Sequence, residues 1–377
     1  CNNEVKSLNY EANEIDKIEL LDTSSKDGHR IYIRGILYIM AKALNEVYPE
    51  ALLSVNYQLS SAMFCKIDNM EITDEIIANV KARMQEIINQ NLEIRKVVMT
   101  KEEAEEFYSN EKTLRGIVQI DNTQKEGVSL YYCEDYFNYF FGVMPVTTAY
   151  TDVFDVIKYG DGFLVRYPSA EKPNELTNYK SNKKLLSTLE EYEDIHRVLQ
   201  IDTLYKLNKE IKEGRTSNVI LLSEALHEKK MANIADDIAK RKNVKMVLIA
   251  GPSSSGKTTF AKRLGVELRL NGLKPVTISV DNYFVERVDN PKDENGDYDF
   301  ECLEAIDLEL FNNHIKTLLD GGTIEVPTFD FKVGTKRYNG EKMHLADDEI
   351  LVIEGIHCLN DKLTSSIPRE QKYKIYI

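Results

Sequence analysis

The chain has 377 residues, and 48 Lys and Arg against 62 Asp and Glu give it a formal net charge of −14. This length predicts two or three domains, each large enough to bury its own core, and 42% hydrophobic residues exclude a disordered chain. The pI near 5.1 argues against a broad interaction with nucleic acid or anionic lipid, because both need clustered Lys and Arg. Any bound anion must therefore be held by a local site.

Cysteine spacing and hydropathy predict a cytoplasmic protein with no membrane segment. The apolar run Ile31–Leu44 is interrupted by Arg34 and Lys42, so no stretch reaches the roughly 20 apolar residues of a membrane helix. Because the sequence begins with Cys rather than Met, we expect a fragment or a processed form. The cysteines are far apart, without the spacing of a metal site or a disulfide framework, at Cys1, Cys65, Cys133, Cys302 and Cys358.

The N-terminal half changes its hydrophobic pattern several times. The alternating segment "KIELLD" at 17–22 predicts the last strand of a small β module. Apolar residues spaced three to five apart predict a helix from Asp27 to Pro49, and a second helix is predicted over Ile72–Asn91. Strands are expected at "GIVQI", "SLYYC" and "GFLVRY", and a charged helical connector at 183–243.

From Val244 onward, buried strands alternate with helices. "KMVLIA", "PVTISV" and "EILVIEG" are apolar runs typical of strands buried on both faces of a parallel sheet. Helices are predicted at Lys257–Leu270 and Leu308–Leu319. The alternation indicates an α/β domain with a doubly wound parallel sheet. Because the strand "KIYI" ends the sequence, we expect this domain, 244–377, to be truncated at its C-terminus.

Between the first of these strands and its helix lies "GPSSSGKT", which matches the G-x-x-x-x-G-K-[ST] pattern of a phosphate-binding loop. Gly251 and Gly256 permit the backbone angles that direct successive N–H groups into one concavity, and the helix that follows adds its dipole. Lys257 supplies a mobile positive charge, and Thr258 a hydroxyl suited to Mg²⁺. An incidental Gly-rich turn is the alternative. The predicted ATP-binding residues are Gly251, Pro252, Ser253, Ser254, Ser255, Gly256, Lys257, Thr258 and Thr259.

Two acidic residues come at the ends of predicted buried strands. Asp281 follows "VTISV" and Glu354 follows "ILVI", which places both carboxylates at the edge of the sheet where ligands bind. One carboxylate can accept the proton of an attacking hydroxyl while the other orients Mg²⁺. We expect Asp281 and Lys257 to be catalytic, and Thr258 and Glu354 to bind the metal. The alternatives are a helix cap for Asp281 and a solvated strand end for Glu354.

Five segments in order make the region from Val244 to Ile377 resemble the uridine kinase and phosphoribulokinase family: "GPSSSGKTT", "SVDNYF", "YDFECLEAID", "VPTFDF" and "LVIEG". The resemblance implies a P-loop kinase that uses ATP and Mg²⁺, with Asp281 as the general base. It implies that Glu301, where Asp is usual, contacts ribose hydroxyls, and that Glu354 lies near Mg²⁺. The family's Arg-bearing lid lies beyond the strand at which this chain stops.

The acceptor side departs from the uridine kinase pattern. Uridine kinases usually carry Tyr in the fourth segment and a His soon after it, but this chain has Phe329 followed by Lys332, Val333, Gly334 and Thr335. The groups that would recognise a pyrimidine edge are missing, so a non-pyrimidine nucleoside or a sugar-like alcohol is an alternative to uridine. The predicted acceptor-binding residues are Tyr283, Glu301, Phe329, Phe331 and Arg337.

The N-terminal part is similar to domains of threonyl-tRNA synthetases. Residues 1–24 resemble the end of a TGS domain, and 25–182, with "YPEALLSVNYQLSSAMFCKID", resemble the α+β editing domain. That domain carries a H-x-x-x-H pair and a later Cys/His pair. Here Arg34 and Tyr38 occupy the first pair of positions, and "FFGVMPVT" lacks Cys and His. The resemblance therefore implies an editing-like domain without the editing chemistry.

Three functional hypotheses follow. The first is an ATP-dependent kinase that phosphorylates a hydroxyl of a nucleoside-like small molecule. The second is a regulatory or tRNA-binding protein whose P-loop only senses the nucleotide, but neither half of the chain has the excess of basic residues that tRNA binding favours. The third gives the N-terminal region a role in dimerisation, which would make the protein a homo-oligomer.

Overall fold

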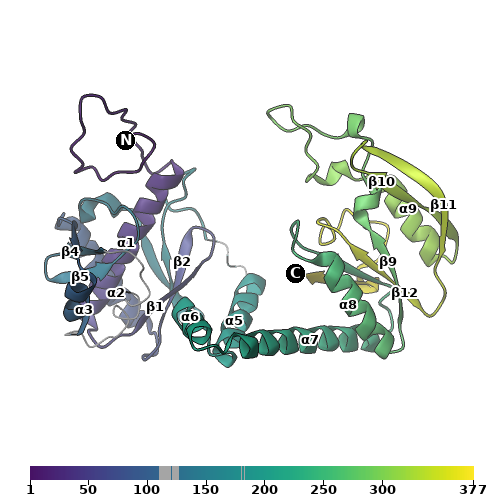
Figure 1. Cartoon of the computed structure of the whole chain (residues 1–377), viewed down its shortest axis with the longest axis horizontal. Helices are drawn as coiled ribbons and strands as arrows, with labels where there is room; N and C mark the ends of the chain where they lie inside the picture. The colour runs from purple at the N-terminus through teal and green to yellow at the C-terminus, as the bar shows by residue number, and fades with distance from the viewer. Residues whose placement is uncertain (110–119, 121–126, 180, 182) are drawn as a thin grey trace. The chain divides into compact units, whose positions relative to one another are not determined.

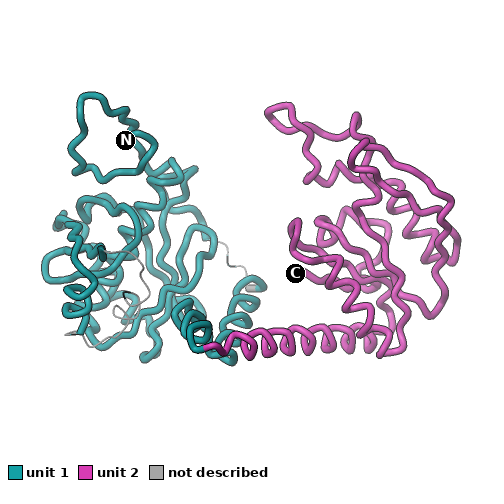
Figure 2. Tube along the Cα trace, in the orientation of Figure 1, with its two compact units in different colours: residues 1–213 teal, residues 214–377 magenta. Residues whose placement is uncertain are grey.

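The computed structural model describes residues 1–109, 120, 127–179, 181 and 183–377. The chain forms two compact units, Cys1–Glu213 and Gly214–Ile377 (Figure 2), and each is described by itself. The division between them falls inside the segment 183–243 that the sequence predicts as a helical connector. The predicted strand "GIVQI" at 116–120 lies, apart from Ile120, outside the described residues.

The first unit is built around two antiparallel sheets (Figure 1). One has the strand order β1-β2-β7-β6, and the other the order β3-β4-β5. Two helices, α1 (Lys26–Val47) and α2 (Asp74–Asn89), share a hydrophobic core with the first sheet. The strands are β1 (Leu53–Gln58), β2 (Ala62–Ile67), β3 (Arg95–Met99), β4 (Val128–Cys133), β5 (Tyr136–Tyr139), β6 (Asp155–Tyr159) and β7 (Gly162–Arg166), and α3 is Lys101–Ser109.

Local capping residues set the ends of these helices. The Ser25 side chain accepts a hydrogen bond from the N–H of Gly28 and begins α1, while Pro49 follows its end and cannot continue a helix. Thr73 caps α2 in the same way. Both predicted helices and the strands at "SLYYC" and "GFLVRY" are confirmed. The segment "KIELLD" is not a strand, because it pairs with no other strand in the described chain.

Three helices follow the first unit's sheets along the chain. They are α5 (Lys183–Val198), α6 (Leu204–Lys212) and α7 (Thr216–Lys240), and Gly214, with a φ of +73°, lies in the break before α7. The C-terminal half of α7 belongs to the core of the second unit, where Met231, Ala235 and Ile238 are buried. The Tyr373 hydroxyl, 2.9 Å from Asp237 Oδ2, also joins α7 to the sheet.

The second unit contains a four-stranded sheet in the order β13-β8-β12-β9, and every pair in it is parallel. The strands are β8 (Met246–Ala250), β9 (Lys274–Ser279), β12 (Glu349–Glu354) and β13 (Lys372–Tyr376). Helix α8 (Lys257–Leu270) connects β8 to β9, and α9 (Leu308–Leu319) lies later in the chain. The predicted doubly wound α/β fold is confirmed, and both helices have the predicted bounds.

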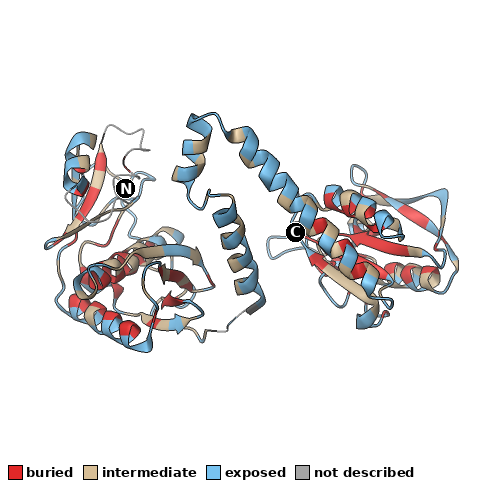
Figure 3. Cartoon of the chain, turned by 90° about the horizontal axis from the view of Figure 1, so that it is seen from below, coloured by how far each residue is buried: buried red, intermediate tan, exposed pale blue. Residues whose placement is uncertain are grey.

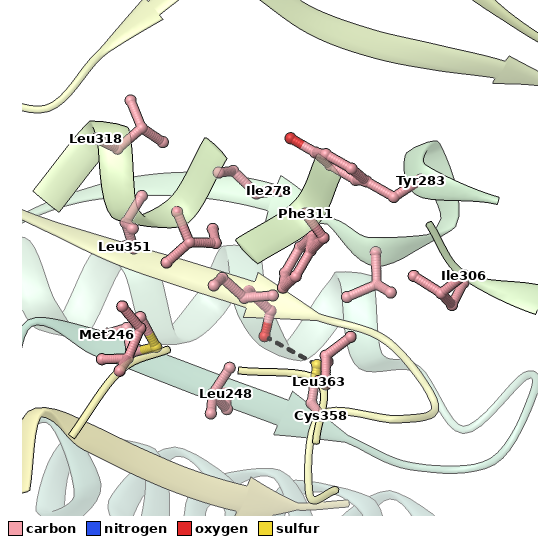
Figure 4. Packing of buried hydrophobic residues seen from close by; sticks show 14 of the residues in the cluster. Met246, Leu248, Ile278, Tyr283, Ile306, Phe311, Leu318, Leu351, Cys358 and Leu363 are labelled. Atoms are coloured by element: carbon pink, nitrogen blue, oxygen red, sulfur yellow. Dashed lines mark hydrogen bonds between the residues drawn. The ribbon is translucent and has the colours of Figure 1, made fainter. Parts of the chain in front are cut away.

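Side chains of alternate residues fill two separate cores on the two faces of this sheet. Val247, Ile249 and Val352 pack with α7 and α8. Met246, Leu248 and Leu351 pack on the opposite face with α9 (Figure 4). Figure 3 shows that the buried residues concentrate on the strands and on the inward sides of the helices. Burial on both faces explains why these strands are continuous apolar runs in the sequence.

The rest of the second unit lies around β10 and β11. Strands β10 (Thr323–Asp330) and β11 (Thr335–His344) form an antiparallel hairpin. Short 3₁₀ helices occur at Val280–Tyr283, Arg287–Asp289, Leu303–Ala305 and Arg369–Gln371. An isolated bridge joins Phe284 to Ile306, so the segment after β9 lies beside the segment before α9.

We expect Leu351→Ala to lower the free energy of unfolding by about 2 to 5 kcal/mol, because Leu351 is fully buried on the central strand β12 and the substitution leaves a cavity. Leu270→Ala is the matched control. Leu270 is 77% exposed at the end of α8, so its change should stay within about 0.5 kcal/mol. Urea unfolding followed by circular dichroism measures both, and equal effects of the two substitutions would contradict the described core.

Candidate functional site

The loop between β8 and α8 has the backbone geometry of an anion cradle. Gly256 begins α8 with a φ of +91°, and no side chain caps this end of the helix. Ser254 also has a positive φ, of +61°. The residues from Pro252 to Gly256 are exposed, and so the first N–H groups of α8 face solvent. Such a helix start binds anions through its N–H groups and its dipole.

The two glycines of the motif serve different purposes. A side chain at Gly256 would meet no atom within 4 Å, so glycine is required there for its backbone angle. At Gly251, an added Cβ would lie 2.6 Å from both Ser255 Oγ and the carbonyl oxygen of Ile377, so glycine is required there for space. Lys257 folds back over the loop, and its Nζ donates to the Pro252 carbonyl oxygen over 2.9 Å.

The register of the parallel sheet brings the two predicted carboxylates to this loop. Glu354, the last residue of β12, is paired with Ile249 of β8 on one side and with Ser279 of β9 on the other. Gly251 comes two residues after Ile249, and Asp281 two residues after Ser279. Glu354 therefore lies between the start of the loop and Asp281, at the carboxyl edge of the sheet.

Glu354 is buried, with only 6% of its surface exposed, and a neighbouring strand orients it. Ser279 Oγ donates a hydrogen bond of 2.8 Å to Glu354 Oε1. Gly355 leaves room for this arrangement, because a Cβ there would lie 2.7 Å from the Cβ of Val280. A buried carboxylate needs hydrogen-bonding or charged partners, and Ser279 provides one.

Asp281 is exposed at the sheet edge, yet the protein around its carboxyl group removes part of its water. This desolvation raises the pKa of Asp281, and the charge of Glu354 raises it further. The positive charges of Lys257 and His357 act in the opposite direction. Three charged neighbours therefore act on the Asp281 carboxyl group, and a perturbed pKa of this kind is common in sites that perform acid–base chemistry.

The predicted acceptor-binding residues lie on separate segments. Glu301 is exposed, in a turn where Asp299 Oδ1 accepts from the N–H of Glu301 over 2.9 Å. Phe329 is buried and Phe331 is half exposed, with their ring centroids 5.0 Å apart and both rings against Phe284. These rings and Phe300, which also contacts Phe284, form one aromatic cluster beside Glu301.

The other two predicted acceptor residues have protein partners. Tyr283 is fully buried against Phe311 (Figure 4), and its hydroxyl lies 3.1 Å from His314 Nδ1. Arg337 is exposed on β11, and its Nη2 lies 3.0 Å from Asp330 Oδ2. Tyr283 lies in the same 3₁₀ helix as Asp281, and its buried side chain anchors that segment in the core.

Two residues of this site were not predicted as functional from the sequence. Ser279 donates a hydrogen bond to Glu354. The charge of His357 acts to lower the pKa of Asp281, and its Nε2 lies 3.1 Å from the Cys302 carbonyl oxygen. Both occur beside predicted motif residues, two before Asp281 and three after Glu354. Their closeness in sequence to Asp281 and Glu354 is the one feature that could have suggested a functional role. Their contacts depend on strand register, which the sequence does not show.

The oxygen atoms at this edge are of the kind that Mg²⁺ prefers. Thr258 offers a hydroxyl, and Glu354 and Asp281 offer carboxylates. In the described part of the chain, no group of three or more His, Cys, Asp and Glu side chains could hold a metal ion by itself. A magnesium ion that arrives with a nucleotide needs only one or two protein ligands, so these residues fit such an ion.

Three further observations concern the rest of the chain. A hollow of about 530 Å³ lies between α9 and residues 362–366. Neither the phosphate-binding loop nor Glu354 and Asp281 line this hollow. The five cysteines, all in described positions, are free thiols. Among the described helices, none has the length and apolar character needed to cross a membrane.

In the first unit, Arg34 and Tyr38 occupy the positions that align with the histidine pair of the editing domain, and both make hydrogen bonds to backbone carbonyls. Arg34 Nη1 donates to the Val143 carbonyl oxygen over 2.9 Å. The hydroxyl of the fully buried Tyr38 lies 3.0 Å from the carbonyl oxygen of Tyr131 and 3.2 Å from that of Tyr136. Both side chains thus join α1 to the segment that contains "FFGVMPVT" and the strands before it.

The second unit is similar to a known family of proteins. Residues 246–377 match the family model described as Phosphoribulokinase / Uridine kinase family. The matched residues lie within the second unit. The chain is 29% identical over 119 residues to a uridine kinase of Halobacterium salinarum and 32% identical over 125 residues to one of Ligilactobacillus salivarius. These matches cover 32% and 33% of this chain, and 51% and 57% of those proteins.

The N-terminal region is similar to another class of protein. A threonine–tRNA ligase of Clostridium kluyveri is 25% identical over 129 residues, which is 34% of this chain and 20% of that protein. The chain thus spans about half the length of the uridine kinases and a fifth of this ligase. The combined architecture expected from the sequence, a kinase-family domain with a synthetase-like N-terminal region, is confirmed.

The raised pKa of Asp281 has a consequence for stability. Because its folded-state pKa lies above the unfolded value, the folded state loses stability from this group as the pH rises through that pKa. We therefore expect Asp281→Asn to be more stable than the wild type at neutral pH. The difference should shrink below about pH 4, where the carboxyl group is protonated in both states.

Thermal unfolding at several pH values measures this difference. Asp347→Asn, in the exposed turn before β12, is the control and should leave stability nearly unchanged at every pH. An Asp281→Asn variant that is less stable than the wild type at neutral pH would contradict the described environment.

Proposed function

We propose that the protein is an ATP-dependent kinase that transfers the γ-phosphoryl group to a hydroxyl of a nucleoside or a related small molecule. The observation that carries the proposal is the strand register, which gathers a phosphate cradle, Glu354 and Asp281 at one edge of the sheet. The match of the same residues to the phosphoribulokinase and uridine kinase family supports it.

Different groups of the loop are proposed to bind different parts of the nucleotide. The N–H groups at the start of α8 bind the phosphates, and Lys257 leaves the Pro252 carbonyl to contact their oxygens. Thr258 and Glu354 hold Mg²⁺, which neutralises phosphate charge when bound. Lys257 and the N-terminal dipole of α8 concentrate positive potential at this loop, so the net charge of −14 does not oppose an anionic nucleotide.

Asp281 is the proposed general base. Its carboxylate accepts the proton of the acceptor hydroxyl while the acceptor oxygen bonds to the γ-phosphorus and the bond from that phosphorus to ADP breaks. A raised pKa makes the carboxylate a better proton acceptor near neutral pH. Exposure of Asp281 at the sheet edge lets an acceptor reach it.

The acceptor is proposed to bind between Glu301 and the aromatic cluster. Glu301 accepts from sugar hydroxyls, and Phe329, Phe331 and Arg337 border the same region, while Tyr283 supports it from the core. Phenylalanine rings offer a stacking face without hydrogen-bonding groups. This favours a nucleoside that is not recognised through a pyrimidine edge, or a sugar-like alcohol.

The domain layout is part of the proposal. It comprises a TGS-like segment at 1–24, an editing-like domain at 25–182, a helical connector at 183–243 and the kinase domain at 244–377. The contacts of Arg34 and Tyr38 with backbone carbonyls support an N-terminal region without editing chemistry. Five free thiols are typical of a reducing compartment, and we place the protein in the cytoplasm.

Asp281→Asn is expected to retain ATP binding and to lower turnover by roughly 100- to 10,000-fold, the range typical of a lost general base. Calorimetric titration with a non-hydrolysable ATP analogue measures binding, and ADP release with Mg²⁺ and a panel of nucleosides measures turnover. Asp347→Asn should match the wild type in both. Unchanged turnover in Asp281→Asn would refute the assignment of the base.

A further inference from the structure

His357 joins the two halves of the proposed site. It lies in the turn after β12, three residues beyond Glu354, and its Nε2 is 3.1 Å from the carbonyl oxygen of Cys302. A carbonyl oxygen carries no proton, so Nε2 must be the donor in this hydrogen bond. The bond spans 55 residues of sequence and connects the phosphate side of the site to the acceptor side.

Cys302 belongs to a tight turn that presents Glu301. Asp299 Oδ1 accepts from the N–H groups of Glu301 and Cys302 over 2.9 and 3.1 Å. The Cys302 thiol lies 3.2 Å from the Asp299 carbonyl oxygen. These bonds hold Glu301 and Cys302 in one turn, so a contact to the Cys302 carbonyl also restrains Glu301.

Other contacts tie this turn and the 3₁₀ helix after it to a different part of the chain. Asn290 Nδ2 donates to the Asp299 carbonyl oxygen over 2.9 Å, and the N–H of Val285 donates to the Ala305 carbonyl oxygen over 2.9 Å. Both donors lie in the segment after Asp281. The His357 bond instead ties the turn to the strand that ends at Glu354.

We propose that His357 is a positioning residue that holds the Glu301 turn at the correct place relative to Glu354 and Asp281, and so determines how well the acceptor binds. The positive charge of His357 also acts on the Asp281 carboxylate. This role rests on the proposed function, since it concerns the acceptor of that reaction.

His357→Ala is expected to raise the KM for the acceptor about 5-fold, the value of one ordinary hydrogen bond. The KM for ATP should change little, because the loop stays in place. The change in kcat should be smaller than the change in the acceptor KM, because Asp281 stays in place and only loses the influence of the His357 charge. His357→Gln keeps an N–H donor on the side chain and should restore most of the acceptor affinity. A purely structural role would raise both KM values and lower kcat together, without rescue by Gln.

His344→Ala is the matched control. His344 also contacts a backbone carbonyl, with its Nδ1 3.1 Å from the Gly322 oxygen, but it lies at the end of β11 outside the proposed site. Its removal should leave the acceptor KM unchanged. An equal rise in His344→Ala and His357→Ala would overturn the proposal.

Hydrogen exchange of the Glu301 and Cys302 amides tests the positioning without any enzyme assay. In the full chain, His357→Ala should exchange these amides faster than the wild type, and His357→Gln and His344→Ala should not. Equal rates in all four proteins would overturn the positioning role. If the wild type phosphorylates no acceptor, the proposed function fails, and the exchange rates alone decide whether His357 holds the turn.

Discussion

Parallel pairing of β8, β12 and β9 is the constraint on which the candidate site depends. Parallel strands end at the same edge of a sheet, and the observed register pairs Glu354 with both Ile249 and Ser279. The phosphate loop begins two residues beyond one of these partners, and Asp281 lies two residues beyond the other. A slip of one residue would exchange the side chains that face α8 with those that face α9, so the two buried cores maintain the geometry of the site.

The same constraint imposes an electrostatic cost. It places a buried carboxylate, Glu354, close enough to Asp281 to raise the pKa of Asp281, although like charges in a desolvated place oppose folding. The Ser279 hydroxyl and the Lys257 charge reduce this cost without removing it. Two neighbouring carboxylates beside a solvent-exposed loop lower the stability of the fold. Such a cost is typical of functional sites.

Helices whose apolar pattern and terminating residues lie close together in the sequence were predictable from it. The bounds of α8 match the prediction, and those of α9 match its approximate range, because an apolar pattern defines each helix and a glycine follows each C-terminal end. "KIELLD" alternates like a strand, but a strand also needs a partner. The burial of Tyr283 and the bonds made by Ser279 and His357 depend on residues tens of positions away, and no local pattern carries that information.

The most direct test of phosphoryl transfer at this sheet edge follows the phosphorus atom itself. The full-length protein is incubated with ATP labelled in the γ-phosphate, Mg²⁺ and a mixture of nucleosides and sugar alcohols, and the products are separated by chromatography. The account predicts that label appears in a phosphorylated acceptor with the wild type and not with Asp281→Asn. The account would be contradicted if, with the wild type, the label stayed in ATP or appeared only as inorganic phosphate. Equal transfer by the wild type and Asp281→Asn would also contradict it.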